Sequence, residues 1–325
     1  MSGWELPCIS ERHVPERTQD DTMAQATVQQ QGRRTGWRSV AVCLLLGCAT
    51  LAQGDGPRLG MAGGDEAHRA RFTDALETAL QARGLPAPVW QGGRRSELLI
   101  ALGDDAFRDA LTRQRPVVGV FVSRTVALEA YTAGCVCTAF FSEADPARQL
   151  HLARLMFPGA RRVGLFTGPD SAWAAGLLQA GIADDDWVLV HETARDAADL
   201  TRRLPRLLAQ VDVLLAVSDP ALYNADNART LLLTSYRQGR PVIGPDDFMV
   251  QAGGVATTYS SGLDQVEDVA DLLARLQARG SLQGRLPPPD FGRHFSVRVN
   301  AHVARSYDVP LVDPAALGRQ LEAWQ

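Results

Sequence analysis

The sequence contains no lysine, so its 33 Lys+Arg residues are all arginine. This absence excludes a Walker-type phosphate loop, a Schiff-base lysine and a kinase-type strand lysine, because each of these sites needs the lysine amine. A GC-rich coding sequence is the simple explanation for the bias. The net charge is −4 and no basic stripe occurs, so nothing indicates a nucleic-acid partner.

Sequence motifs for catalysis and for metal binding are also missing. The chain has no G-x-S-x-G, H-E-x-x-H or G-x-G-x-x-G pattern, and its 6 histidines show no ligand spacing. We therefore expect no enzymatic activity, no cofactor and no metal site. An exported α/β enzyme stays open only as a third hypothesis.

The apolar runs are too short to cross a bilayer, which takes about 20 residues. The run at 40–46 follows Arg33, Arg34 and Arg38 and precedes small residues, which is the pattern of a secretory signal. Residues 1–55 are therefore expected to be a disordered extension and an export signal, and the protein is expected in the periplasm or bacterial cell envelope.

The motif LLGC at 45–48 resembles a bacterial lipobox, which would make Cys48 a lipidated N-terminus. Ordinary cleavage after Ala52 is the alternative, and the twin arginines indicate a third export route. Cysteine is scarce beyond the signal, where only Cys135 and Cys137 occur. Two strand rises between them are long for a mutual disulfide, so we expect two small core residues.

From residue 57 onward, strand-like and helix-like segments alternate, which predicts α/β architecture with parallel sheets. We expect two doubly wound lobes joined by a hinge, at 56–142 and 143–260, with 261–325 returning to brace the first lobe or both. The segment 211–262 is the clearest unit. Its buried-type strands at 213–217 and 241–244 end in polar loops, where open α/β sheets bind ligands.

Four phrases carry a family resemblance: LMFPGARRVG (155–164), RPVIG (240–244), AGGVA (252–256) and FSVRVN (295–300). Their order and spacing resemble the ABC-transporter substrate-binding proteins of the type I periplasmic-binding-protein fold, in the branch related to aromatic-amino-acid-binding lipoproteins. Two features depart from that pattern. Only 91–97 separate two strands that a helix normally separates, so the first lobe is abridged, and Gly103-Asp104-Asp105 replaces the usual small-hydroxyl loop.

If this resemblance holds, loops at strand ends line a cleft between the lobes. The expected ligand-binding residues are Asp104, Ser123, Arg124, Thr167, Ser218, Asp219, Asp246 and Tyr259. An amino-acid-like solute needs an acceptor for its ammonium, for which Asp219 is the candidate, and donors for its carboxylate, for which Ser123 and Arg124 are the candidates. Tyr259 or Phe248 is the candidate for stacking on an aromatic ligand.

Each of these residues also has a structural interpretation. Asp219 fits an Asp-Pro turn or a helix cap, and Asp104 fits a helix cap. Arg124 fits a surface ion pair, while Tyr259 and Phe248 fit a core.

The resemblance implies an exported solute-binding component of an ABC-type uptake system, which binds a small-molecule solute without chemistry. Its partner would be an ABC permease in the inner membrane, and its only membrane contact a lipid anchor. The alternative is an envelope accessory or sensor protein that uses the same scaffold to engage a protein partner.

Overall fold

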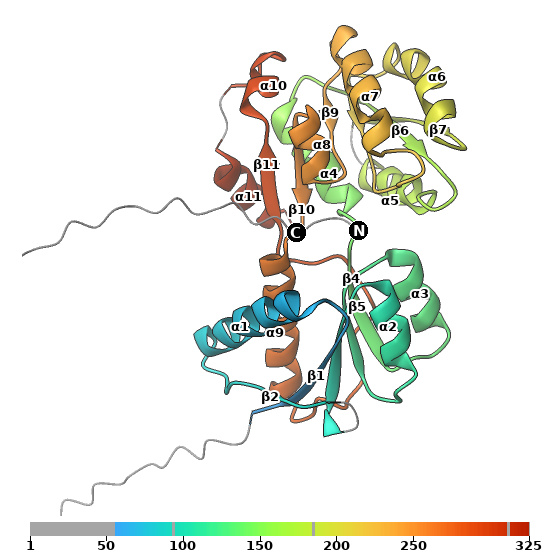
Figure 1. Cartoon of the computed structure of the whole chain (residues 1–325). Coiled ribbons are helices and arrows are strands. Elements are labelled where there is room, and N and C mark those ends of the chain that lie inside the picture. The colour runs from blue at the N-terminus through green and yellow to red at the C-terminus, as the bar shows by residue number, and fades with distance from the viewer. Residues whose placement is uncertain (1–55, 93–94, 184–185, 311–312, 325) are drawn as a thin grey trace, which may run out of the picture. The chain divides into compact units, whose positions relative to one another are not determined.

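The computed structural model describes residues 56–92, 95–183, 186–310 and 313–324, so the predicted export signal and the predicted lipidation site Cys48 lie outside the described residues. Everything described belongs to the compact unit Leu51–Gln325. Strands and helices alternate along it as the sequence predicts (Figure 1).

The first sheet has the strand order β2-β1-β3-β4-β5, and its paired strands are all parallel. Its strands are β1 (Arg58–Ala62), β2 (Val89–Trp90), β3 (Leu98–Leu102), β4 (Val117–Val122) and β5 (Cys137–Phe141). The helices between them are α1 (Glu66–Ala82), α2 (Asp104–Leu111) and α3 (Arg124–Thr132). We refer to this sheet with its helices as lobe 1.

Alternation of side chains along the strands divides the core of lobe 1 in two. Leu98 and Ile100 of β3 pack with α1 and with the later helix α9 (Gly262–Ala278), whereas Leu99 and Ala101 pack with α2 and α3. This two-faced burial follows from the period of two along a strand. It also explains why these strands read as continuous apolar runs.

The abridgement of lobe 1 is visible between β2 and β3. Seven residues, 91–97, separate these strands. A helical crossover between parallel strands takes a dozen residues or more, so there is no room for one here.

The second sheet has the strand order β11-β10-β9-β8-β6-β7, and only its β10–β11 pair is antiparallel. Its strands are β6 (Arg162–Thr167), β7 (Val188–Thr193), β8 (Val213–Leu215), β9 (Val242–Ile243), β10 (Ala256–Tyr259) and β11 (Ser296–Val299). Its helices are α4 (Pro146–Met156), α5 (Trp173–Gly181), α6 (Ala197–Leu208), α7 (Ala225–Arg237), α8 (Asp247–Ala252), α10 (Ala301–Arg305) and α11 (Pro314–Glu322). We call this sheet with its helices lobe 2.

The segment after Ser261 divides between the two lobes. Helix α9 packs against α1 of lobe 1, but the chain then returns, so that β11 pairs with β10 and α11 contacts β11 and α4. Within the described residues the chain therefore passes between the lobes three times, after β5, after β10 and after α9.

The two cysteines of lobe 1 form a disulfide, so the expectation of two separate core residues was wrong. Cys135 precedes β5 and Cys137 begins it, so the backbone between them is not fully extended and their Cα atoms lie 5.3 Å apart. That distance lies within the usual range for a disulfide. A hollow of about 470 Å³ borders the pair, at the amino end of β5.

Candidate functional site

At the carboxyl ends of the lobe 1 strands, two of the predicted residues bind each other. Asp104 is the first residue of α2, and Ser123 is the N-cap of α3. Asp104 Oδ1 accepts a hydrogen bond from the Ser123 amide at 2.7 Å, and its Oδ2 accepts one from the Ser123 hydroxyl at 2.8 Å. The Ser123 donors, expected to hold a solute carboxylate, are thus used by the protein's own carboxylate.

The next backbone amide, that of Arg124, is also bound by a carboxylate of the protein itself. Its backbone amide donates to both carboxylate oxygens of Glu143 at 3.0 Å, and the Ser142 hydroxyl donates to Glu143 Oε2 at 3.1 Å. Burial raises the pKa of Glu143, and the hydrogen bonds from Arg124 and Ser142 work against that rise. Glu143 lies in the first passage between the lobes.

The Arg124 side chain lies on aromatic rings. Its guanidinium carbon is 4.7 Å from the ring centroid of Trp173 and 5.9 Å from that of Phe141, which are cation–π distances. Phe291 extends the group, with its ring centroid 5.0 Å from Phe141 and 6.0 Å from Trp173. We call Arg124, Phe141, Trp173 and Phe291 the Arg124 cluster.

The Arg124 cluster joins parts of the chain that are far apart in sequence. Arg124 and Phe141 come from lobe 1, Trp173 begins α5 of lobe 2, and Phe291 lies in the passage after α9. Apart from the ring contacts, the Arg124 guanidinium makes no hydrogen bond or ion pair with any described residue. The surface ion pair that the sequence allowed for Arg124 is therefore not seen within this part of the chain.

In lobe 2, Asp219 is engaged in internal contacts. Its side chain is buried, at 2% exposure, and Oδ2 accepts hydrogen bonds from the Ser171 hydroxyl at 2.6 Å and the Gly168 amide at 3.2 Å. Oδ1 accepts from the Ala221 amide at 3.1 Å. These contacts match the Asp-Pro turn that the sequence left open, and they leave little room for a solute ammonium.

The other predicted residues of lobe 2 are spread along the sheet. Thr167 is buried and shares a 2.8 Å hydrogen bond with His191, while Ser218 is exposed. Asp246 caps α8, since its Oδ1 accepts from the Met249 amide at 2.8 Å. Tyr259 is half-buried at the end of β10. Thr167 therefore lies close to Asp219, because the next residue, Gly168, donates a hydrogen bond to Asp219. Asp246 and Tyr259 belong to other parts of the lobe, the cap of α8 and the end of β10.

Trp173, Phe291 and Glu143 are the residues that sequence reasoning missed. Trp173 follows the polar loop after β6, the kind of position where the other site residues were sought. Its indole N–H donates to the Asp170 carbonyl at 2.9 Å, which fixes the ring at the start of α5. No pattern in the sequence marks Phe291, because it lies in a proline-rich passage outside any regular element.

Buried glutamines support the passages between the lobes. Gln149 of α4 donates to the carbonyls of Gly244 at 2.8 Å and Thr258 at 3.2 Å, and it accepts from the Thr258 amide at 3.0 Å. Gln265 of α9 donates to the Phe141 carbonyl at 3.0 Å and accepts from the Phe121 amide at 2.8 Å. Both thus satisfy backbone groups at or near strand ends, including Phe141 of the Arg124 cluster.

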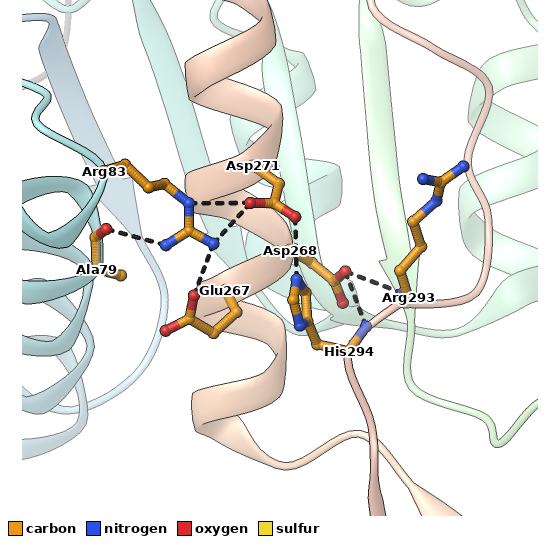
Figure 2. A network of polar contacts seen from close by, with 7 residues as sticks. All are labelled: Ala79, Arg83, Glu267, Asp268, Asp271, Arg293 and His294. Atoms are coloured by element: carbon orange, nitrogen blue, oxygen red, sulfur yellow. Dashed lines mark hydrogen bonds and ion pairs between the residues drawn. The ribbon is translucent and has the colours of Figure 1, made fainter. Parts of the chain in front are cut away.

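A charged network anchors the passage that carries Phe291 (Figure 2). Arg83, the C-cap of α1, binds Asp271 of α9 at 2.6 Å and Glu267 at 2.7 Å, and Asp271 binds the His294 ring at 3.0 Å. Asp268, one turn before Asp271, accepts from the backbone amides of Arg293 at 2.9 Å and His294 at 3.2 Å. The network therefore fixes the residues directly after Phe291 to lobe 1.

Two carboxylates of this network have pKa values shifted in opposite directions. Burial raises the pKa of Asp268, which is 3% exposed, to about 6, although the His294 and Arg293 amides lower it. The pKa of Asp271 is lowered by its hydrogen bonds to His294 and Arg83, which outweigh its partial burial. The folded protein therefore keeps a proton on Asp268 in a pH range where the unfolded chain has lost it, and the reverse holds for Asp271.

We expect Asp268→Asn to remove a pH-dependent loss of stability. As the pH rises from 3.8 through about 6, the wild type loses the stability that protonated Asp268 contributes, which is at most about 3 kcal/mol. Asparagine does not titrate, so the variant shows no such loss. The melting temperature of Asp268→Asn should therefore rise relative to wild type between pH 4 and pH 7. Thermal unfolding across this range measures the effect.

Asp271→Asn is the matched control, and its expected sign is opposite. Because the pKa of Asp271 is lowered, the folded protein gains stability from this carboxylate above its unfolded pKa, and it loses that stability as the pH falls through the folded pKa. Asp271→Asn should therefore be less stable than wild type at pH 7 and approach wild type in acid. Parallel curves for wild type and Asp268→Asn would contradict the assignment of Asp268.

Neither a metal site nor a membrane span is found in the part of the chain that the structure describes. No group of three or more His, Cys, Asp and Glu side chains there is arranged to hold a metal ion. None of the described helices combines the length and the apolar character that crossing a bilayer requires.

Comparison with known proteins places the fold. No protein-family model matches the chain, and no curated protein matches it. Among solved structures, a substrate-binding protein with adhesive properties from Clostridium difficile, in its ligand-free, open structure, matches with TM-score 0.61 and 13% identity, over 80% of this chain and 97% of that one.

Two further solved structures match with lower scores. An ABC domain in complex with L-Trp from Streptococcus pneumonia has TM-score 0.51 and 11% identity, over 82% of this chain and 98% of that one. A conserved domain protein from Vibrio cholerae has TM-score 0.50 and 16% identity, over 82% and 98%. At these identities the likeness shows the fold alone, and the predicted fold, two parallel-sheet lobes of the type I periplasmic-binding-protein kind, is confirmed.

Proposed function

We propose that this protein is an exported solute-binding component of an ABC-type uptake system, which holds a small solute at the Arg124 cluster without changing it chemically. The observation that carries the proposal is the contact between Arg124 of lobe 1 and Trp173 of lobe 2. Both residues follow the carboxyl ends of parallel strands, where open α/β sheets bind ligands.

The chemistry of the cluster supports this role. Ligand pockets are mostly apolar and aromatic, with a few polar groups that fix the ligand's orientation. The three aromatic rings of the cluster fit the apolar part of that description, and the guanidinium that lies on them has no carboxylate partner among the described residues. Closure of two lobes on a solute by hinge motion would use the three passages, of which one carries Glu143 and another Phe291.

The transport partner, the location and the membrane anchor are proposed from the sequence. The permease partner in the inner membrane and the location in the periplasm or cell envelope rest on the export signal and the family resemblance. A lipid anchor at Cys48 is proposed on the lipobox-like motif. Mass spectrometry of the mature N-terminus tests it: a lipid mass on Cys48 supports the anchor, and a terminus after Ala52 contradicts it.

A second candidate function has an observation of its own. Strand-end amides at Ser123, Arg124 and Gly168 are already bound by the carboxylates of Asp104, Glu143 and Asp219. A scaffold with these amides filled and lobe 1 abridged fits an envelope accessory or sensor protein that engages a protein partner.

A thermal-shift screen against amino acids, organic amines, purines and sugars separates the two candidates. A solute at 100 times its Kd stabilises the folded protein by about 2.7 kcal/mol, which raises the melting temperature by about 5 °C or more. We expect at least one solute class to give this shift. If no solute does while a protein partner co-purifies in fixed stoichiometry, the receptor function is wrong and the second candidate holds.

A further inference from the structure

A positive group already occupies the aromatic faces of the proposed site. The Arg124 guanidinium lies over Trp173 and Phe141, with no carboxylate among the described residues paired to it. Cations bind to the face of an aromatic ring because the ring quadrupole is negative there, and tryptophan is the best such ring. The rings are therefore suited to a positive partner, and Arg124 supplies one from within the chain.

The donors that would suit a negative solute are in use. The amides of Ser123 and Arg124 bind Asp104 and Glu143, and the Gly168 amide contacts Asp219 Oδ2 and the Ser171 hydroxyl. A solute carboxylate would have to displace groups tethered to the same chain, which compete at a high effective concentration. This arrangement disfavours anions at the strand ends of both lobes.

The carboxylates beside Arg124 lack a cation of their own. The hydrogen bonds of Asp104 and Glu143 come from amides and hydroxyls, and neither forms an ion pair with an arginine or histidine side chain in the described parts of the chain. Both oxygens of Asp104 and Oε1 of Glu143 accept one hydrogen bond each, so each keeps a lone pair for a further donor, whereas Glu143 Oε2 already accepts two. Glu143 binds the backbone of Arg124, so it lies within one arginine side chain's reach of the Trp173 ring.

From these contacts we infer that the solute is an organic cation, carrying an ammonium, amidinium or guanidinium group that replaces the Arg124 guanidinium on the Trp173 ring. Asp104 and Glu143 would balance its charge, and Phe291 would cover any ring that it carries. The inference rests on the proposed function and adds to it the charge class of the solute. It departs from the amino-acid-like solute expected from the sequence, because the foreseen amine partner, Asp219, is buried in internal hydrogen bonds and the foreseen carboxylate donor Ser123 is bound to Asp104.

Three compounds with the same phenol ring and different charge test the inference in the wild-type protein: tyramine, tyrosine and 4-hydroxyphenylacetate. Calorimetric titration is expected to give tyramine a Kd at least 10-fold below that of tyrosine, and no measurable binding of the anion. Tyrosine or 4-hydroxyphenylacetate binding as tightly as tyramine would overturn the inference.

Two variants give readouts that a merely structural role would not produce. Arg124→Ala removes the competing internal cation, so it should tighten tyramine binding several-fold. Glu143→Gln keeps an acceptor for the Arg124 amide but removes the charge, and should weaken tyramine about 10-fold. Loss of tyramine binding in Arg124→Ala would show that Arg124 is itself a ligand donor, contrary to the inference.

Failure of the inference and failure of the proposed function are distinguishable. If the solute screen selects an anion or a sugar and no cation, the charge class is wrong while the receptor function stands. If no member of the screen binds, both are wrong.

Discussion

Replacement of Gln149 by leucine is expected to lower the free energy of unfolding by about 3–5 kcal/mol. The side chain is 1% exposed, and its amide bonds to the Gly244 carbonyl and to both backbone groups of Thr258. Leucine has a similar volume, so the loss comes from the backbone groups that Gln149 binds. The Thr257 hydroxyl reaches both the Gly244 and the Thr258 carbonyls but has one proton to donate, so one carbonyl and the Thr258 amide lose the partner described here, at about 1–3 kcal/mol each. Urea denaturation monitored by circular dichroism measures it.

The same change at Gln179 is the control. Gln179 is exposed on α5, and surface substitutions of this kind stay within about 0.5 kcal/mol. If Gln149→Leu were as mild as Gln179→Leu, the Gln149 contacts would not hold α4 to the ends of β9 and β10 as described.

Replacement of Asp219 by alanine is expected to cost about 2–4 kcal/mol of stability. Its carboxylate is buried and accepts hydrogen bonds from Gly168, Ser171 and Ala221, which join the loop after β6 to the loop after β8. The neighbouring loop residue Asp170 is exposed, so Asp170→Ala should change stability by less than about 0.5 kcal/mol. Thermal and urea unfolding of both variants give the comparison.

This experiment also decides between the two interpretations of Asp219. A turn residue loses stability when it is replaced, whereas a residue that binds a solute ammonium loses affinity with little change in stability. An Asp219→Ala protein as stable as wild type but with weakened solute binding would contradict the structural role.

The alternation of elements could be predicted because helices and strands have different apolar periods, and buried parallel strands read as continuous apolar runs. The short gap between β2 and β3 was visible for the same reason. The final passage was harder: nothing local indicates that the chain after α9 leaves lobe 1 and adds β11 to the second sheet. The Cys135–Cys137 disulfide was not predicted, because two strand rises separate the cysteines only in a fully extended chain, and Cys135 precedes the strand.

Only part of the candidate site could be predicted from the sequence, namely its residues from lobe 1. Strand-end reasoning found Asp104, Ser123 and Arg124, since each follows a recognisable strand. It did not show that Asp104 and Ser123 bind each other, because backbone amides carry no sequence signal. Trp173 and Phe291 are 49 and 167 residues from Arg124, and only the tertiary structure brings the three together.

The proposed solute binds at the contact between the Arg124 guanidinium and the Trp173 ring. The most direct measurement is calorimetric titration of the solute that the thermal screen selects into wild type, Trp173→Ala and Trp324→Ala. Trp324 is 42% exposed and stacks on His151 of lobe 2, outside the Arg124 cluster, so it controls for the loss of a tryptophan. We expect one site in wild type, unchanged affinity in Trp324→Ala and at least a 10-fold loss in Trp173→Ala, whereas unchanged affinity in Trp173→Ala would contradict the account.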